Sequence, residues 1–416
     1  MKLRYKIAFG GFVCLMVFHA AVAWLIQWSG QRALEREIEQ VIAAGGARDF
    51  SAFDELDIPD DENAALAWLE VFRELDKFDT PASGMTNEEV YDAWSDYEID
   101  GLGSAMEARR AVFEQAHAAA QLEQVRWPYD YAYLDEFFNT GYFGKSRKFA
   151  RFLVIDATAA LSKEDWERAD KSLVAALSLS EDIVAVPLLI NTLVSVSIDM
   201  LVIESLEGIE PVGWGHLPNT VGALTDRDYR DWFRKALLGE VAYGLSYDWD
   251  ADGATSEGLL RVPARLWRNH DLAFYTMRLR EMSALVRRPY YELEPELRAI
   301  EAYDYPRVYP ISASYLESSS ACVLTLGRME LRRDLMIWAA ALAGTESISH
   351  TPIDALTGQP LKRWRSPGGG WVLWSIEAEK PESAIAVRDL SVWLTQPGTL
   401  PPELQPYAYE LNDEKD

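Results

Sequence analysis

Carboxylates at alternate positions mark the stretch of this chain with the most specific chemistry. Asp248, Asp250 and Asp252 precede a glycine, so hard oxygen ligands and a turn surround one point, as in the first half of a calcium loop. The second half differs, because Leu259 stands at the twelfth position and the nearest acid is Glu257. The pattern predicts a calcium site with Asp248, Asp250, Asp252 and Glu257 as ligands. The alternative is an acidic loop between two helices.

Two further acids lie in apolar surroundings. Glu240 follows Gly239, and the positions three and four residues away on the same helix are largely apolar or aromatic. Asp199 lies in the very apolar stretch 183–203. A half-buried carboxylic acid can have a raised pKa and act as a general acid. The alternative for both residues is an ion pair with an arginine across a helix interface.

Other kinds of site find no support in the sequence. The five histidines belong to no H-E-x-x-H or C-x-x-C pattern, and no G-x-S-x-G or phosphate-loop motif occurs. Cys14 and Cys322 are far apart, which argues against an intramolecular disulfide. The net charge of −26, from 66 acids and 40 bases, argues against nucleic-acid binding, which needs a basic surface. It also argues against flat adsorption on anionic lipid, so contact with the membrane is expected through an anchor alone.

The elements that must position these residues are helices. Apolar residues recur at helical spacing in residues 65–75, 103–123, 149–160, 166–177, 229–241, 264–287 and 314–343. Ser162-x-x-Asp165 and Thr225-x-x-Asp228 are patterns typical of helix starts. The short connection at Ser162 predicts an antiparallel helical hairpin like those of helical-repeat proteins. The Pro- and Tyr-rich stretch 289–310 is expected to be a connection.

An uncharged apolar segment, residues 7–28, precedes the helical region and is long enough to span a bilayer. The basic tail 1–6 favours a cytoplasmic N-terminus, with the bulk of the chain on the far side. The alternative is a signal peptide cleaved after Ala23, although the apolar run continues beyond that residue. Both alternatives export the rest of the chain. Residues 29–46 continue the helical pattern and predict an amphipathic stalk that ends at two glycines.

The predicted domain order follows from these patterns. The exported all-α domain covers residues 47–344, and the 183–203 stretch is expected to be its buried central helix rather than a second span, because it carries polar residues. A C-terminal element, 345–396, contains two short runs with strand character around a Ser-Pro-Gly-Gly-Gly stretch, which predicts a small β-hairpin. The Pro-rich acidic tail 397–416 is expected to be extended or disordered. The fold class is therefore mostly α.

The predicted hairpin carries a resemblance. The motifs Asp354-x-x-x-Gly358-x-Pro360-Leu361, Arg365-Ser-Pro367-Gly368 and Trp371-Val-Leu-Trp374-Ser375 resemble the C-terminal hairpin of type II secretion major pseudopilins, where an Asp/Gly/Pro turn precedes two strands. The resemblance implies a hairpin at this position.

The wider layout is similar to a group of uncharacterised bacterial membrane-anchored helical envelope proteins. The shared features are an N-terminal anchor, the helix start Pro59-Asp-Asp-Glu-Asn63-Ala-Ala, the Pro-Leu-Leu-Ile stretch 187–190, the Gly239-Glu240 pair and the terminal hairpin. This resemblance implies an envelope location and brings no activity with it.

These features predict a single-pass protein of the bacterial inner membrane with a periplasmic domain. The expected function is a non-enzymatic scaffold or subunit of an envelope protein complex, with the lipid bilayer as partner of residues 7–28 and other envelope proteins as partners of the domain. An aromatic content of 12% and the acidic composition support an alternative, a glycan-active enzyme or binder on an α/α toroid with a Trp-lined groove. That alternative needs two carboxylates beside a cleft.

Overall fold

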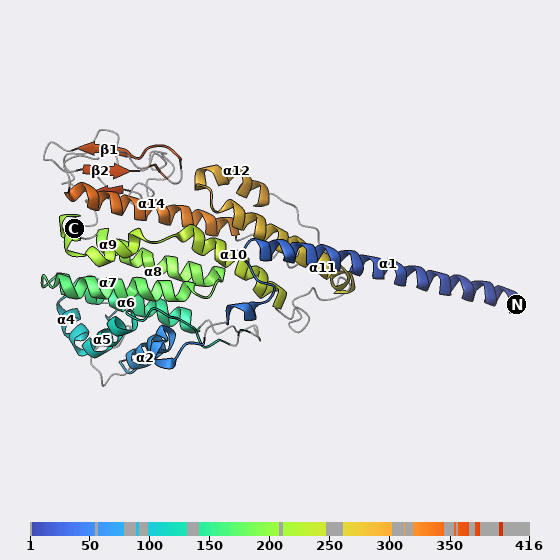
Figure 1. The fold of residues 1–416 in the computed structure, drawn as a ribbon, viewed down its shortest axis with the longest axis horizontal. Coiled ribbons are helices and arrows are strands. Elements are labelled where there is room, and N and C mark those ends of the chain that lie inside the picture. Colours follow the sequence, from blue (N-terminus) through green and yellow to red (C-terminus); the bar gives the residue numbers. More distant parts are fainter. Residues whose placement is uncertain are drawn as a thin grey trace.

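The computed structural model shows a helical protein (Figure 1). It describes residues 2–54, 57–78, 89–90, 99–129, 131, 141–207, 211–246, 261–301, 312, 319–344, 353–354, 357–365, 371–374 and 391–393. Within these ranges 12 α-helices account for most of the structure, which confirms the mostly α class.

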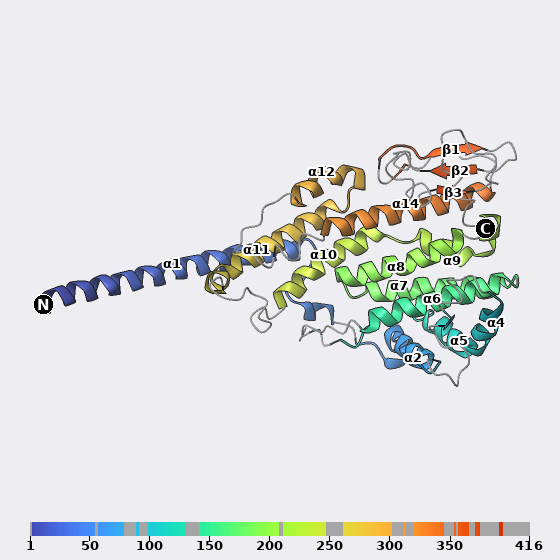
Figure 2. The same ribbon diagram turned by 180° about the vertical axis from the view of Figure 1, so that it is seen from behind.

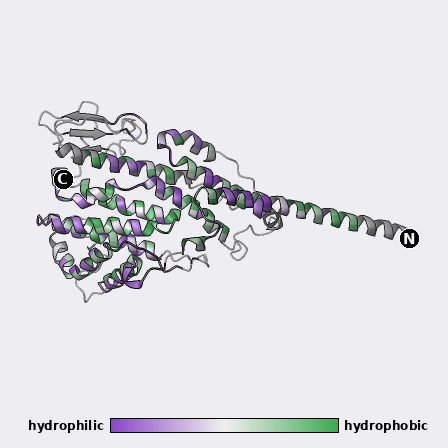
Figure 3. Ribbon diagram, in the orientation of Figure 1, coloured by the Kyte–Doolittle hydropathy of each residue, from purple (hydrophilic) through white to green (hydrophobic). Residues whose placement is uncertain are grey.

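The longest described element is α1 (Lys2–Ala43), a single helix that projects from the domain as a rod (Figures 1 and 2). Figure 3 shows hydrophobic colours along its projecting part, where Phe18 and Trp24 are more than 60% exposed. A helix of this length and hydropathy is able to cross a membrane, and a signal sequence has the same properties. The helix ends where Gly45 adopts a φ of 90°, which is the stop that the glycines predicted.

The second half of α1 packs along α11 (Arg261–Leu285), and both helices run in the same direction. The Ser29 hydroxyl lies 3.0 Å from His270 Nε2, and two turns later the Glu37 carboxylate lies 3.1 Å from Arg280. Gly30 permits the close approach, because a Cβ there would lie 2.9 Å from the His270 ring. The predicted stalk is therefore docked on the domain, and its apolar side chains Leu34, Ile38 and Val41 are buried.

The centre of the domain consists of α6 (Gly141–Leu161), α7 (Trp166–Val184), α8 (Leu189–Glu207) and α10 (Tyr229–Ser246), which lie side by side in Figure 1. α8 is the very apolar helix of the sequence. Its polar residues are enclosed by neighbouring helices, since Asn191, Thr192, Ser195 and Asp199 are all at most 1% exposed. α8 is thus a core helix, as predicted.

Two helix starts are set by acids rather than by hydroxyls. The Asp165 side chain accepts a hydrogen bond from Arg168 N at the start of α7, and Asp228 accepts one from Asp231 N at the start of α10. Ser162 instead donates to the Ala159 carbonyl in the preceding helix. The Ser-x-x-Asp and Thr-x-x-Asp patterns therefore marked the right places, but the capping side chain is the acid.

The other described helices surround this centre. They are η1 (Phe50–Phe53), η2 (Asp60–Glu62), α2 (Ala64–Asp76), α4 (Ile99–Ala108), α5 (Arg110–Ala119), η4 (Pro211–His216), α9 (Pro218–Thr225), α12 (Tyr290–Glu301) and α14 (Ser319–Gly344). α2, α4 and α5 lie beyond α6, and α14 lies beyond α8 (Figure 1).

Two of the sequence expectations are wrong. The helix expected over 103–123 is divided at Arg109, because this arginine is buried, donates to the Ala105 carbonyl and lies over the Phe78 ring. The expected connection 289–310 contains α12, which begins directly after Pro289 and includes Pro295. Pro289 precedes the first turn, where proline is tolerated, whereas Pro295 lies inside α12 and removes one backbone hydrogen-bond donor, so a Pro-rich stretch does not exclude a short helix.

Three short strands lie above α14 in Figure 2: β1 (Lys362–Arg365), β2 (Trp371–Trp374) and β3 (Ser391–Trp393). They pair antiparallel in the order β1-β2-β3, with Arg365 opposite Trp371. The Ser-Pro-Gly-Gly-Gly connection on which the hairpin prediction rests, and the tail 397–416, lie outside the described residues. The hairpin as such stays a prediction.

Candidate functional site

The predicted calcium ligands Asp248, Asp250, Asp252 and Glu257 lie outside the described residues. The structure describes their surroundings only: α10 ends at Ser246 and α11 begins at Arg261. The acidic stretch therefore connects two helices, a position that both interpretations share, and calcium binding stays a prediction. Within the described ranges, no group of three or more His, Cys, Asp or Glu side chains is placed to hold a metal ion.

Glu240 lies at a junction between α10 and α8. Its Oε1 accepts a hydrogen bond of 2.8 Å from Leu189 N, the first residue of α8. Burial raises the pKa of Glu240 to about 7, and the bond from Leu189 opposes that rise. A carboxylate suits this position because the N-terminus of a helix presents unpaired N–H groups and a partial positive charge. The partner is thus a backbone amide rather than the arginine expected from the sequence.

Gly239 explains why α8 and α10 approach so closely at this junction. A Cβ at Gly239 would lie 1.8 Å from the Pro187 carbonyl oxygen, so no larger residue fits without moving backbone. The Pro-Leu-Leu-Ile stretch and the Gly-Glu pair, distant in the sequence, therefore form one contact. Nearby, burial and the charge of Glu240 raise the pKa of Cys322, which keeps this thiol protonated and unreactive.

Asp199, the second predicted acid, forms the ion pair that the alternative interpretation expected. Its Oδ2 accepts a hydrogen bond of 2.9 Å from the Tyr229 hydroxyl and lies 3.3 Å from Arg227 Nε. Arg227 also donates to Glu181, at 2.7 Å. Burial raises the pKa of Asp199, and the positive charge of Arg227 opposes this rise. Asp199 is fully buried, so no substrate reaches it, and the pair joins α8 to the start of α10.

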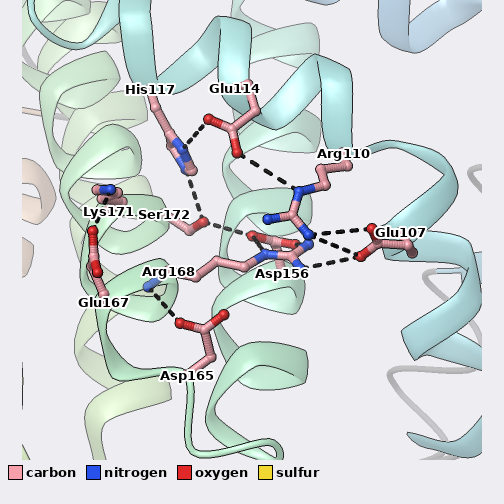
Figure 4. Close-up of polar contacts among 10 residues, drawn as sticks. All are labelled: Glu107, Arg110, Glu114, His117, Asp156, Asp165, Glu167, Arg168, Lys171 and Ser172. Atoms are coloured by element: carbon pink, nitrogen blue, oxygen red, sulfur yellow. Dashed lines mark hydrogen bonds and ion pairs between the residues drawn. The ribbon is translucent and has the colours of Figure 1, made fainter.

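A third polar cluster, which the sequence patterns did not indicate, joins α5, α6 and α7 (Figure 4). Asp156 is fully buried and accepts hydrogen bonds from Arg168 and, at 2.7 Å, from the Ser172 hydroxyl. His117 Nε2 lies 3.1 Å from the same hydroxyl oxygen. Burial lowers the pKa of His117, which favours the neutral imidazole.

The residue types of this cluster are those of a serine hydrolase, but the hydrogen bonds between them are arranged differently. In a catalytic triad the carboxylate orients the histidine and the histidine accepts the serine proton. Here the single Ser172 proton points to Asp156, so His117 must be the donor to Ser172. Ser172 is also fully buried. The cluster therefore has no accessible nucleophile and serves to connect three helices.

Buried tryptophans are also used for packing. The Trp68 indole N–H donates to the Asp182 carboxylate at 2.6 Å, and the Trp127 indole N–H donates to the Asp182 carbonyl at 2.8 Å. Burial raises the pKa of Asp182 to about 7, and the bond from Trp68 opposes that rise. Both rings are at most 2% exposed, so neither can serve as a stacking surface for a sugar.

A shallow pocket of about 430 Å³ lies between η4 and α9. It is lined by Trp214, Gly215, Pro218, Val221, Gly222, Thr225 and Asp226. Trp214 is only 3% exposed and its indole N–H donates to the Leu206 carbonyl. Asp226 is the single carboxylate of the lining, whereas glycoside hydrolysis uses two. This pocket therefore does not support the glycan-active alternative.

Comparison of the chain with protein families, curated proteins and solved structures gave no match. Its function is therefore inferred from the geometry alone.

Proposed function

We propose that this protein is a non-enzymatic, membrane-anchored scaffold or subunit of an envelope protein complex. The observation that supports this proposal most strongly is the continuity of α1. One helix carries an exposed apolar half and a half that is built into the domain, where Leu34 and Val41 are 7% and 0% exposed. A flexible tether needs no such docking, whereas a scaffold benefits from a domain held at a fixed height and direction above the membrane.

The polar residues of the domain support the same proposal. Glu240, Asp199 and Asp156 are the acids whose burial first suggests chemistry, and each is used to join helices. Buried polar groups that bond across helix interfaces favour one arrangement of the helices, which is what a scaffold needs.

The location belongs to the proposal as well. We place the tail 1–6 in the cytoplasm, residues 7–28 in the bacterial inner membrane and the domain in the periplasm. We further propose that β1 and β2 form the terminal hairpin of this domain. An apolar helix preceded by basic residues supports this topology. Mass spectrometry of the purified chain tests it: an intact N-terminus is expected, and a terminus at Trp24 would show that the helix is a cleaved signal peptide.

Cross-linking of the full chain in its own membrane tests the scaffold proposal. Gly30→Val should disturb the α1–α11 contact, because the added side chain meets the His270 ring, and should thereby reduce cross-links between the domain and neighbouring envelope proteins. Gln40→Val is the matched control, since residue 40 is exposed on the same helix. Identical cross-links in both variants and in the parent chain would contradict the proposal that α1 positions the domain.

A further inference from the structure

A stripe of four side chains follows one face of α1: Trp24, Trp28, Arg32 and Arg36. They are four residues apart, which places them on one side of a helix, and all four are exposed. The Trp24 and Trp28 rings stack at 6.0 Å, and the Arg32 guanidinium lies 4.0 Å from the centre of the Trp28 ring. We refer to these residues as the Trp/Arg stripe.

The Trp/Arg stripe points away from the domain. Polar or close contacts to α11 come from Ile26, Ser29, Gly30, Gln31 and Glu37 of α1, and none of these residues belongs to the stripe. At about 100° per residue, Gly30 and Glu37 lie roughly opposite to Trp28 and Arg32, whereas the contacts of Ser29 and Gln31 border the stripe. The domain therefore leaves the stripe available to the surroundings of α1.

The stripe also lies where the run of exposed apolar residues on α1 ends. The run of exposed large apolar residues extends up to Trp28, with Ile42 exposed farther along, and burial against the domain begins at Gly30. Tryptophan is enriched where a bilayer meets water, because its ring is apolar and its N–H is polar. Arg32 follows one helical turn farther out, about 6 Å along the axis, which is the level of lipid phosphates.

The charges around the stripe fit an anionic partner despite the acidic composition of the chain. Glu35 is occupied by Arg48 at 2.8 Å, and Glu37 pairs with Arg280 on the contact face. Glu39 lies beyond Arg36, farther from the membrane. Within the described part of the chain, no carboxylate lies within 4.0 Å of Arg32 or Arg36, so both guanidinium groups can bind phosphate oxygens, for which their planar fork is suited.

We propose that the Trp/Arg stripe binds the headgroups of anionic phospholipids where α1 leaves the membrane, and so fixes the height and rotation of the anchored domain. This inference rests on the proposed function, because it takes α1 as a retained membrane anchor. It replaces the expectation that the membrane is contacted by an apolar anchor alone. The recognised group is a lipid phosphodiester held in a bilayer, with the acyl chains against Trp24 and Trp28.

Quenching of tryptophan fluorescence by brominated lipids in nanodiscs tests the proposal. Bromine quenches at contact distance, so only tryptophans next to lipid respond. The full chain is placed in nanodiscs of phosphatidylcholine mixed with phosphatidylglycerol, and bromine is carried by one lipid or by the other. We expect phosphatidylglycerol to be enriched around the chain by about fivefold for each arginine engaged, and the enrichment to fall as salt is raised.

Arg32→Gln/Arg36→Gln is the decisive variant, and Arg147→Gln, an exposed site on α6, is its control. The enrichment should fall to about one in the double variant and remain unchanged in the control. Equal enrichment in the double variant and in the parent chain would overturn the lipid proposal while leaving the anchor intact. Failure of the parent chain to enter nanodiscs of phosphatidylcholine alone would instead overturn the anchor itself, and the lipid proposal with it.

Discussion

Replacing Gly239 with alanine should force α8 and α10 apart. The new Cβ would lie 1.8 Å from the Pro187 carbonyl oxygen, while carbon and oxygen normally approach to about 3.3 Å, so the two backbones must separate by about 1.5 Å. Overpacking of this kind costs about 1–3 kcal/mol. The movement also weakens the bond of 2.8 Å between Leu189 N and Glu240, worth about 1 kcal/mol. We expect a loss of about 3 kcal/mol in the free energy of unfolding.

Urea unfolding of the full chain in detergent, followed by circular dichroism, measures this loss. Gly222→Ala is the matched control: it lies in helix α9, where nothing is within 4 Å of an added Cβ, and should stabilise by about 0.5–1 kcal/mol, as alanine does in helices. Opposite signs for the two variants are the expected result. An unchanged midpoint for Gly239→Ala would refute the close contact between the two motifs.

Three further predictions concern buried charge and metal. Because the pKa of Glu240 is raised to about 7, the parent chain should lose stability as pH rises from about 4.5 to 7, by up to about 3 kcal/mol from this residue. Glu240→Gln should flatten the dependence of Tm on pH. Equal slopes of Tm against pH in the variant and the parent chain would exclude Glu240 as the origin of this loss. Asp156→Ala should cost about 3 kcal/mol in chemical denaturation, because it removes the buried acceptor of Arg168 and Ser172 and leaves Arg168 with the exposed Glu107. Glu167→Ala, which breaks the exposed pair with Lys171, should change stability much less, and similar losses would contradict the buried role. EDTA should lower Tm and Asp250→Ala should abolish that response, while a Tm insensitive to EDTA would exclude a stabilising calcium ion.

The helices of the domain could be predicted because their signals are local. Apolar residues three and four positions apart identified α7, α10 and α11, and the glycines at 45 and 46 identified the end of α1. The sequence also predicted that α8 is a core helix, because its polar residues would be costly in contact with lipid. Helix boundaries were less certain: the break at Arg109 depends on a side chain whose partners come from other helices.

The site could be predicted only in part, because its contacts join distant residues. For Asp199 the sequence left two possibilities, a general acid and an ion pair with an arginine, and nothing in it selects Arg227. The partner of Glu240 is a backbone amide, which no residue type reveals. The cluster of His117, Asp156 and Ser172 was not predicted, because its members lie on three helices and form no motif in the sequence.

The central claim is that the docked α1 helix mounts this domain as a subunit of a larger envelope complex. The mass of the full chain, extracted from its own membrane under mild conditions, tests this claim most directly. We predict a discrete particle of defined stoichiometry well above the 47.0 kDa of one chain, containing at least one other envelope protein and disrupted by Gly30→Val but not by Gln40→Val. A single chain of 47.0 kDa with only lipid or detergent bound would contradict it.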